Sequence, residues 1–474
     1  MKKAILTSII LLFSNLVIAQ ITTTSTHKLQ ENEFGFQEKY TSKFDPQGKD
    51  IIPLHTQKST ALSTVVFGFL PYWEYSANAH TNLRYNLLSH IAAFDFIADV
   101  NGNISNPSGW PWTDVINAAH NAGTKVIMVV ANFNASEINT LLTNSTAKNN
   151  LFNNIKNTIA TYQLDGVNID FEGLNLADRG SLINNFMGDL TTYIHAQLPG
   201  KEVSFDGPAV NWGGWDFNGL VQNVDHLIIM AYDYNGSWSS TTGAVSPLTH
   251  PSNGISVTKT VNSDYGTAIA NAASKIVLGV PYYGKHWETA TSSAGATVTD
   301  YVKSTFYRDT DDDAPLNGGY LWDSNSQTPW FRWNQSGWNQ IWAENEQSLA
   351  LKYDLALNKN LGGIGIWALN YDGNKTDLWD LIDAKFNTAL AVDDSFIKQQ
   401  LHVYPNPAKE QLTILNPKQL KIATIEIYNT YGQKLKNGIL KKNVIDLSNL
   451  KKAVYFIKIK DDLGNQGTFK IIKS

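Results

Sequence analysis

Residues 164–173 carry the clearest chemical signal in the chain, Leu-Asp-Gly-Val-Asn-Ile-Asp-Phe-Glu-Gly. In a β-strand alternate side chains point to one face, so Asn168, Asp170 and Glu172 would lie together, with apolar residues facing the other way. Carboxyl groups are costly to bury unless they are paired or used in chemistry. The apolar opposite face argues against the solvated edge of a sheet. The pattern therefore indicates a catalytic pair of carboxyl groups, a typical arrangement for cleaving glycosidic bonds.

Short apolar runs recur through the chain and alternate with stretches of helical spacing, which predicts the framework for this pair. The runs are Val65–Tyr72, Leu88–Phe96, Lys125–Phe133, Leu164–Glu172, Glu202–Ala209, His226–Tyr234, Lys275–Tyr283 and Gly362–Asn370. Runs that are apolar throughout predict strands buried on both faces, as in a parallel sheet. Eight of them with helices between predict an α/β fold, a (β/α)₈ barrel with functional residues at the C-terminal ends of the strands.

The central run resembles the Asp-Gly-x-Asp-x-Asp-x-Glu signature of glycoside hydrolase family 18, the chitinase family. It matches at Asp165, Gly166, Asp170 and Glu172, and it differs at Asn168, where the family usually has Asp. Four further runs resemble other strands of the family in the same order: Phe67–Trp73, Met230–Tyr234, Leu278–Gly284 and Gly363–Trp367. The resemblance covers about residues 60–390 and implies a TIM barrel with an insertion at about 285–361 between strands 7 and 8.

The resemblance implies specific roles for the matching residues. Glu172 would protonate the leaving oxygen, Asp170 would hold the substrate's acetamido group, and Tyr232 would donate to its carbonyl. The expected substrate-binding residues are Asn168, Met230, Asp233, Tyr283, Trp367 and Trp73. Asp165, at the start of the run, is expected to tie down a turn rather than to take part in chemistry.

No cofactor and no metal are expected. The acidic run Asp309–Asp313 lacks the Gly and Glu of a calcium loop, so a solvated acidic loop is the better interpretation. The His residues show no spacing typical of metal ligands.

Three functions remain open at this stage. The first is a secreted hydrolase of β-1,4-linked N-acetylglucosamine polymers, with chitin as the default substrate and substrate-assisted, retaining catalysis implied by the family. The second is a peptidoglycan N-acetylglucosaminidase, because Asn168 and the run Val130–Phe133 resemble the spore-cortex-lytic branch of the family. The third is a non-hydrolytic chitin-binding lectin, whose mark would be loss of Glu172, which is present.

The two ends of the chain lack the alternation of apolar runs and helical stretches that predicts the barrel. Residues 1–19 have the charged start, apolar run and terminal Ala of a cleaved signal peptide, and 20–62 are a polar leader or linker without a clear period. The catalytic domain is expected over 63–390, followed by a linker at 391–400 and a small all-β sandwich at 401–474. Leu401–Ala408 and the later Ile425–Tyr431 resemble the C-terminal sorting domain of the type IX secretion system of Bacteroidota. A carbohydrate-binding module is disfavoured because this tail has no Trp.

Composition adds limits on partners and location. The net charge of −5 gives no reason to expect a nucleic-acid partner. The chain has no Cys, which excludes disulfides and thiolate metal sites. We expect a monomer that meets the secretion machinery through its tail and ends outside a Gram-negative cell or on its surface.

Asn168 carries a further expectation. Asn cannot ionise, so Asp170 lacks the like-charged neighbour that the family's Asp would supply, and it should stay ionised to lower pH. The Asn168 amide is also expected to hydrogen-bond Asp170 and to fix its rotamer.

Overall fold

The computed structural model describes residues 25–36, 45, 47–55, 62–75, 79–252, 254–387, 400–417, 420–429, 433–438, 443–461 and 466–474. The expected signal peptide at 1–19 and nearly all of the expected linker at 391–400 lie outside these residues. Within the described part, no helix combines the length and apolar character needed to cross a bilayer.

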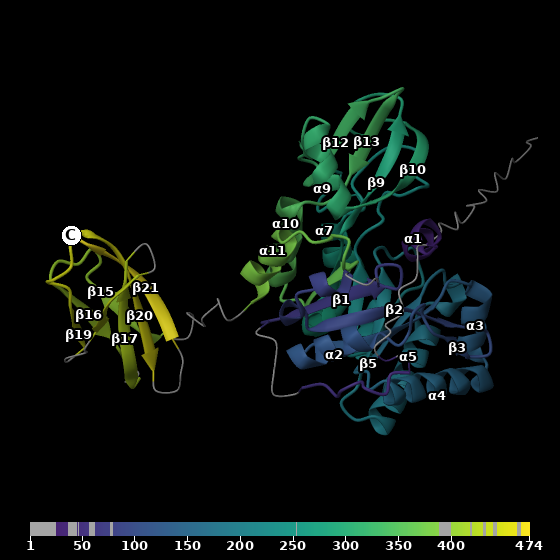
Figure 1. Cartoon of the computed structure of the whole chain (residues 1–474), viewed down its shortest axis with the longest axis horizontal. Helices are drawn as coiled ribbons and strands as arrows, with labels where there is room; N and C mark the ends of the chain where they lie inside the picture. Colours follow the sequence, from purple (N-terminus) through teal and green to yellow (C-terminus); the bar gives the residue numbers. More distant parts are fainter. Residues whose placement is uncertain are drawn as a thin grey trace, which may run out of the picture.

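Eight parallel strands close into a barrel (Figure 1), which confirms the predicted fold. They are β1 (Val65–Pro71), β2 (His90–Ala98), β4 (Lys125–Asn132), β5 (Gly166–Phe171), β6 (Glu202–Pro208), β7 (His226–Met230), β8 (Ile276–Pro281) and β14 (Gly363–Trp367). Each pairs with its neighbour in the order of the chain, and β14 closes the ring on β1 through pairs such as Phe67 with Gly365. A short strand, β3 (Ile104–Ser105), adds to β2.

The strands form as predicted because their side chains are buried on both faces, inside the barrel and under the helices. Every residue of β5 is buried. Gly166 permits a close approach of β5 and β6, because a Cβ atom there would come within 2.2 Å of the carbonyl oxygen of Glu202. A side chain at position 166 would therefore push β5 away from β6.

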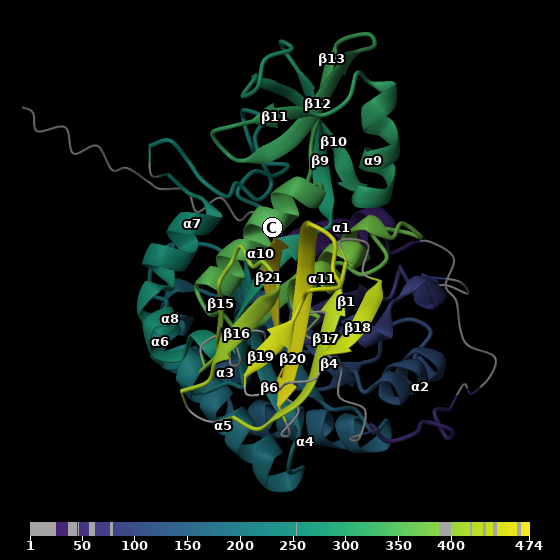
Figure 2. The ribbon, with the colours of Figure 1, turned by 90° about the vertical axis from the view of Figure 1, so that its left-hand side faces the viewer.

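Helices cover the outside of the barrel (Figure 2). They are α2 (Thr113–Ala122), α3 (Ala135–Thr143), α4 (Ser145–Thr161), α5 (Ser181–Gln197), α6 (Phe217–Gln222), α7 (Val257–Lys259), α8 (Gly266–Ala272), α10 (Glu346–Asn358) and α11 (Asp377–Phe386). Polar caps fix several of their starts: Asn144 caps α4, and Asn345 forms a capping box with Ser348 at α10.

An antiparallel subdomain is inserted between β8 and β14, at the position that the sequence predicts. Its sheet runs β10 (Val298–Phe306), β9 (Tyr283–Thr289), β13 (Trp338–Trp342), β12 (Thr328–Asn334) and β11 (Leu321–Asp323). The acidic run 309–313 lies in helix α9 (Tyr307–Leu316), where Lys375 pairs with Asp311 and Asp312. The expectation of an acidic loop is therefore wrong, since the run continues a helix that begins at Tyr307.

The C-terminal module consists of two antiparallel sheets around a core of its own, as predicted for a sandwich. One sheet contains β15 (His402–Tyr404), β16 (Gln411–Leu415) and β19 (Val444–Asp446). The other contains β18 (Lys434–Gly438), β17 (Ile422–Tyr428), β20 (Ala453–Asp461) and β21 (Gln466–Lys473). Residues Leu412, Ile427 and Ile457 are among those that fill the space between the sheets.

The leader contains a helix that the sequence does not predict. Helix α1 (Thr26–Phe34) begins at Ser25, whose side chain accepts from the amides of His27 and Lys28. Its sequence, THKLQENEF, is polar on all sides, so hydrophobic periodicity gives no signal for it. Figure 1 shows α1 beside the barrel and below the inserted subdomain. Polar contacts to both of these parts hold it there.

Candidate active site

The carboxyl groups of the central run meet at the C-terminal end of β5. Asn168, Asp170 and Glu172 share one face, as predicted, and the first two are fully buried. Glu172 follows the strand, with its amide donating to the carbonyl of Asn132 on β4, and 18% of its side chain is exposed. The buried acid and the more open acid thus lie next to each other at the mouth of the barrel.

Aromatic rings form the floor beside these acids. Trp367 ends β14 and is 1% exposed. Trp73, after β1, meets Trp367 edge to face, with ring centroids 6.4 Å apart, and donates through Nε1 to the Tyr371 hydroxyl at 3.1 Å. Phe94 of β2 packs edge-on against Trp367 at 4.8 Å. Such flat, rigid surfaces are suited to stacking against a sugar ring.

The residues after β7 line the opposite wall. Met230 ends β7, and Tyr232 is buried two residues later. The Tyr283 hydroxyl donates to Asp233 at 2.7 Å, so these two expected substrate-binding residues bond to each other. Lys285, fully buried on β9, lies 4.0 Å from Asp233. All nine predicted site residues therefore lie at this end of the barrel or in the strands that lead to it, although their roles remain proposals.

Asn168 does not hold Asp170 as expected. Its amide group donates to the Ser204 hydroxyl at 3.1 Å and to Asp206 at 2.9 Å, both on β6. The expected hydrogen bond to Asp170 is therefore wrong. The physical reason is that side chains on the neighbouring strand β6 lie directly across from Asn168, which pairs in register with Ser204.

Burial dominates the electrostatics of this end of the barrel. It raises the pKa of Asp170 to about 6, with His27 opposing and Glu172 adding to the rise. Burial and the charge of Asp170 raise the pKa of Asp206 well above its ordinary value. Burial, with Glu31 and Asp170, raises the pKa of Asp95 to about 8. Desolvation therefore dominates the pKa of Asp170 in this structure, and the expected effect of Asn rather than Asp at position 168 stays a prediction.

Helix α1 contributes to the same site. The imidazole of His27 contacts Asp170 and Tyr232, the Ser25 hydroxyl contacts Glu172, and Gln30 accepts from Trp367. Burial lowers the pKa of His27, but the carboxylates of Asp170 and Glu172 outweigh burial and raise that pKa well above the usual value. The structure therefore buries an imidazole with a raised pKa among the acids of the site.

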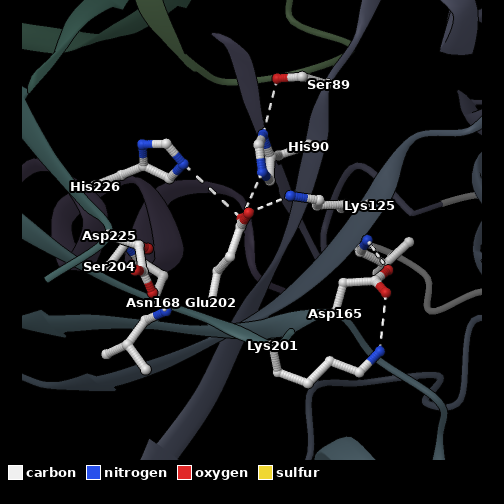
Figure 3. A network of polar contacts seen from close by, with 12 residues as sticks. Ser89, His90, Lys125, Asp165, Asn168, Lys201, Glu202, Ser204, Asp225 and His226 are labelled. Carbon is white, nitrogen blue, oxygen red and sulfur yellow. Dashed lines mark hydrogen bonds and ion pairs between the residues drawn. The ribbon is translucent and has the colours of Figure 1, made fainter. Parts of the chain in front are cut away.

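The opposite end of the barrel holds a second group of histidine and carboxylate side chains (Figure 3). Glu202, at the start of β6, accepts from His90 at 2.8 Å and pairs with Lys125, and His226 lies 3.8 Å away. Nearby, Asp165 accepts from the Val126 amide, His120 and Lys201 (Figure 3 shows the lysine contact). Asp165 thus joins β5 to its surroundings far from the chemistry, in line with the expectation.

Among the described residues, two groups bring three potential cation ligands within 4.8 Å of one another: His90, Glu202 and His226, and His27, Asp170 and Glu172. In both groups the carboxylates are already paired with side-chain cations or imidazoles. We therefore assign neither group to a metal.

Sequence reasoning missed several side chains at the site. Asp95 and Asp206 lie on β2 and β6, and an acid inside an otherwise apolar predicted strand was the available signal. His27 and Gln30 gave no signal, because the polar leader has no period that would indicate docking. One large aromatic side chain, Trp212 on the loop after β6, is 70% exposed.

Comparison with known proteins agrees with the fold. Residues 44–372 match the family model for glycosyl hydrolases family 18, and residues 402–474 match the secretion system C-terminal sorting domain. The putative sporulation-specific glycosylase YdhD of Bacillus subtilis is 29% identical over 246 residues, which cover 50% of this chain and 54% of the relative. Human di-N-acetylchitobiase is 27% identical over 265 residues, covering 48% of this chain and 66% of that protein.

Solved structures share the barrel. The spore cortex-lytic enzyme SleL of Bacillus cereus aligns with a TM-score of 0.58 and 21% identity, covering 68% of this chain and 74% of that one. The family 18 chitinase of Cycas revoluta, in complex with allosamidin, aligns with a TM-score of 0.61 and 18% identity, covering 68% and 99%. The match of more than half the chain to one family model decides the assignment: this protein belongs to the glycosyl hydrolases of family 18 and carries a C-terminal secretion sorting domain.

Proposed function

We propose that the protein hydrolyses β-1,4 bonds that follow N-acetylglucosamine, by substrate-assisted, retaining catalysis. One observation carries this proposal: Asp170, near the end of β5, and Glu172, just after it, both contact the His27 ring, which also contacts Tyr232 and the Trp367 ring. Family 18 is an exception to the usual two-carboxylate mechanism, because the substrate itself supplies the nucleophile. The chain then needs one acid and one group that holds the acetamide.

In the first step the acetamido oxygen attacks the anomeric carbon while the glycosidic C–O bond breaks. Glu172 transfers its proton to the leaving oxygen. Asp170 accepts a hydrogen bond from the acetamide N–H and stabilises the positive oxazolinium ion, and Tyr232 donates to the acetamide carbonyl. In the second step Glu172, now a carboxylate, takes a proton from water, and the oxygen of that water attacks the anomeric carbon with net retention of configuration.

Chitin and its oligomers are the substrates that we favour. The arrangement of acids and aromatic rings suits a 2-acetamido sugar, and the matched human relative is a di-N-acetylchitobiase. The proposed reaction does not need the lactyl group or the peptide that distinguish peptidoglycan from chitin.

Peptidoglycan is a second candidate, supported by two observations. Position 168 is Asn, as in the spore-cortex-lytic branch that the sequence resembles, and the amide contacts Asp206. The matched relatives include the Bacillus subtilis cortical fragment-lytic enzyme, 27% identical over 318 residues. A non-hydrolytic lectin is the alternative of another class, and the presence of Glu172 argues against it.

The sorting domain supports export, and the expected signal peptide at 1–19 would supply the first step of that route. We propose that the protein works outside the cell or on the surface of a Gram-negative bacterium. A monomeric state stays a prediction.

One assay separates the three functions. Release of reducing ends is measured on chitin, on purified peptidoglycan and on a soluble N-acetylglucosamine tetramer, with wild type and Glu172→Gln side by side. Cleavage of the tetramer and chitin supports the first candidate, and cleavage restricted to peptidoglycan supports the second. Binding without cleavage, equal in both proteins, would instead indicate a lectin.

A further inference from the structure

The N-terminal helix fills the place where the proposed mechanism puts the reacting sugar. Thr26, His27 and Gln30 are the buried side chains of α1, and Gln30 lies four residues after Thr26 and three after His27, which places it on the same helical face as both. Asn32, by contrast, is exposed. This buried face points at the catalytic acids rather than at an apolar core.

The His27 ring occupies the aromatic floor. It stacks on Trp367 with centroids 3.7 Å apart and planes at 29°. Its Nδ1 lies 2.9 Å from Asp170, and its Nε2 lies 3.2 Å from the Tyr232 hydroxyl. A flat ring on Trp367, bonded to Asp170 and Tyr232, makes the contacts that the mechanism assigns to the sugar and its acetamide.

Ser25 takes the position of the leaving oxygen. Its hydroxyl donates to Glu172 Oε1 at 2.5 Å, while the same oxygen caps the helix by accepting from the His27 amide at 3.1 Å. The proton donor of the proposed reaction is therefore already engaged by the protein's own chain.

Further contacts anchor the helix at both sides of the cleft. The side-chain oxygen of Gln30 accepts from Trp367 Nε1 at 2.7 Å and from the Tyr371 hydroxyl at 2.9 Å. Toward the inserted subdomain, Glu33 accepts from the Tyr301 hydroxyl at 2.9 Å, and Phe34 packs on Phe306 with centroids 4.4 Å apart.

The contact between α1 and the site leaves some buried polar atoms unpaired, as expected for a segment that substrate can replace. Among the residues that the structure describes, none offers a hydrogen-bond partner to the buried Asp170 Oδ1 or Gln30 Nε2. Buried polar atoms left unpaired cost free energy, which a hydroxyl-rich sugar could recover by bonding to the floor of the site. A polar helix of nine residues is also marginal by itself in water, so α1 is held by these contacts and not by its own propensity.

We propose that residues 25–34 are an intramolecular inhibitor that binds as a substrate mimic, so that the chain is latent until this segment is displaced or removed. The nature of the displaced substrate rests on the proposed function, but occupancy of the cleft does not. Tethering gives such a segment an effective concentration of about 1 mM, so a modest intrinsic affinity is enough to keep the site closed.

The first test uses the full-length chain. His27→Glu places a third carboxylate against Asp170 and Glu172 and should expel the helix. We expect kcat/KM on the soluble N-acetylglucosamine tetramer to rise at least 10-fold over wild type. Asn32→Ala, on the exposed face of α1, is the matched control and should leave kcat/KM unchanged.

The second test is independent of catalysis. A synthetic peptide of residues 25–36 is titrated into the His27→Glu protein by calorimetry. A 10-fold inhibition at about 1 mM effective concentration requires a peptide Kd of about 0.1 mM or below. The same peptide with His27→Ala should bind at least 10-fold more weakly.

The outcomes separate the two proposals. Peptide binding without hydrolysis of any substrate overturns the proposed function and keeps the inhibitor. Equal kcat/KM in wild type and a folded His27→Glu variant, together with no peptide binding, overturns the inhibitor and leaves the function standing.

Discussion

The two ends of the barrel use the same side-chain types in opposite ways. At the N-terminal end, burial opposes the charge of Glu202, but His90 and Lys125 outweigh it and lower the pKa of Glu202 to about 2. At the C-terminal end, burial raises the pKa of Asp170 to about 6 despite His27. The partners of Glu202 come from the barrel strands themselves, whereas the imidazole beside Asp170 comes from a separate helix.

This difference distinguishes a structural ion cluster from a functional one. A carboxylate compensated by its own scaffold stabilises the fold and does not need to change state (Figure 3). Acids that lack a scaffold partner keep a raised pKa and remain available to a proton, a sugar or a competing segment. Substitutions at the two ends should therefore separate activity from stability.

The largest expected effect is on catalysis at the C-terminal end. Glu172→Gln removes the proton donor, and a positioned acid typically contributes about 10²–10⁴-fold to the rate. We expect kcat on the soluble tetramer to fall by at least about 100-fold, with an unchanged midpoint of urea unfolding. Retention of more than a tenth of wild-type kcat would contradict the role of Glu172.

The matched change at the N-terminal end should act on stability instead. Glu202→Gln removes the charge that stabilises the cluster, and a pKa lowered from 4.5 to about 2 corresponds to about 3 kcal/mol. The stabilisation is present above the unfolded pKa and is lost as the pH falls from about 4.5 toward 2. Tryptophan fluorescence during urea unfolding measures this in the catalytic domain alone, because all 14 Trp lie between Trp73 and Trp379. An equal free energy of unfolding for Glu202→Gln and wild type at pH 7 would show that the Glu202 cluster does not stabilise the fold.

Protonation of the His27 imidazole should strengthen the docking of α1 at the C-terminal end of the barrel. The raised pKa of docked His27 means that its contribution to docking is complete below the free value of about 6.5 and is lost as the pH rises through the docked value. The charged groups that face it are Asp170 and Glu172, with Tyr232 at its other nitrogen. Binding of the 25–36 peptide to the His27→Glu protein should weaken about 10-fold per pH unit between the free pKa of about 6.5 and the docked pKa, and should level off above the docked pKa. An affinity that is the same from pH 6 to 10 would mean that His27 docks as a neutral ring.

A smaller effect, on the pH dependence of activity, is expected from a substitution at Asn168 in the middle of β5. Asn168→Asp would place a carboxylate against Asp206 and two residues from Asp170 on the same strand, and like charges raise each other's pKa. In the His27→Glu background the acidic limb of the kcat/KM profile should move up by about one pH unit. The comparison variant is Asn168→Ser, which adds no charge. A limb that moves down would show that Asn168 does not face these acids in the open site.

The smallest effect is expected from the tail. The C-terminal sandwich has a core separate from that of the barrel, so a chain ending at Asn387 should keep kcat within twofold on the soluble tetramer. Circular dichroism controls for folding. A large loss of kcat in a folded fragment would show that the tail belongs to the catalyst and is more than a sorting signal.

The sequence determined the barrel, the insertion and the placement of the acids of β5. Its strands are apolar throughout, so burial on both faces follows from composition, and the two-residue period then places Asp170 and Glu172 on one face. The pattern at the ends of β7 and β14 likewise indicated Tyr232 and Trp367, because strand ends converge in a closed barrel.

Only the tertiary structure decided what compensates each charge. Asn168 contacts β6 rather than Asp170 because Ser204, its partner in register, and Asp206 of that neighbouring strand accept from its amide. The docking of α1 is beyond sequence reasoning for a similar reason. Its stability comes from contacts with residues far along the chain, such as Asp170, 143 positions from His27, and Trp367, 337 positions from Gln30, and a polar helix carries no periodic signal of such contacts.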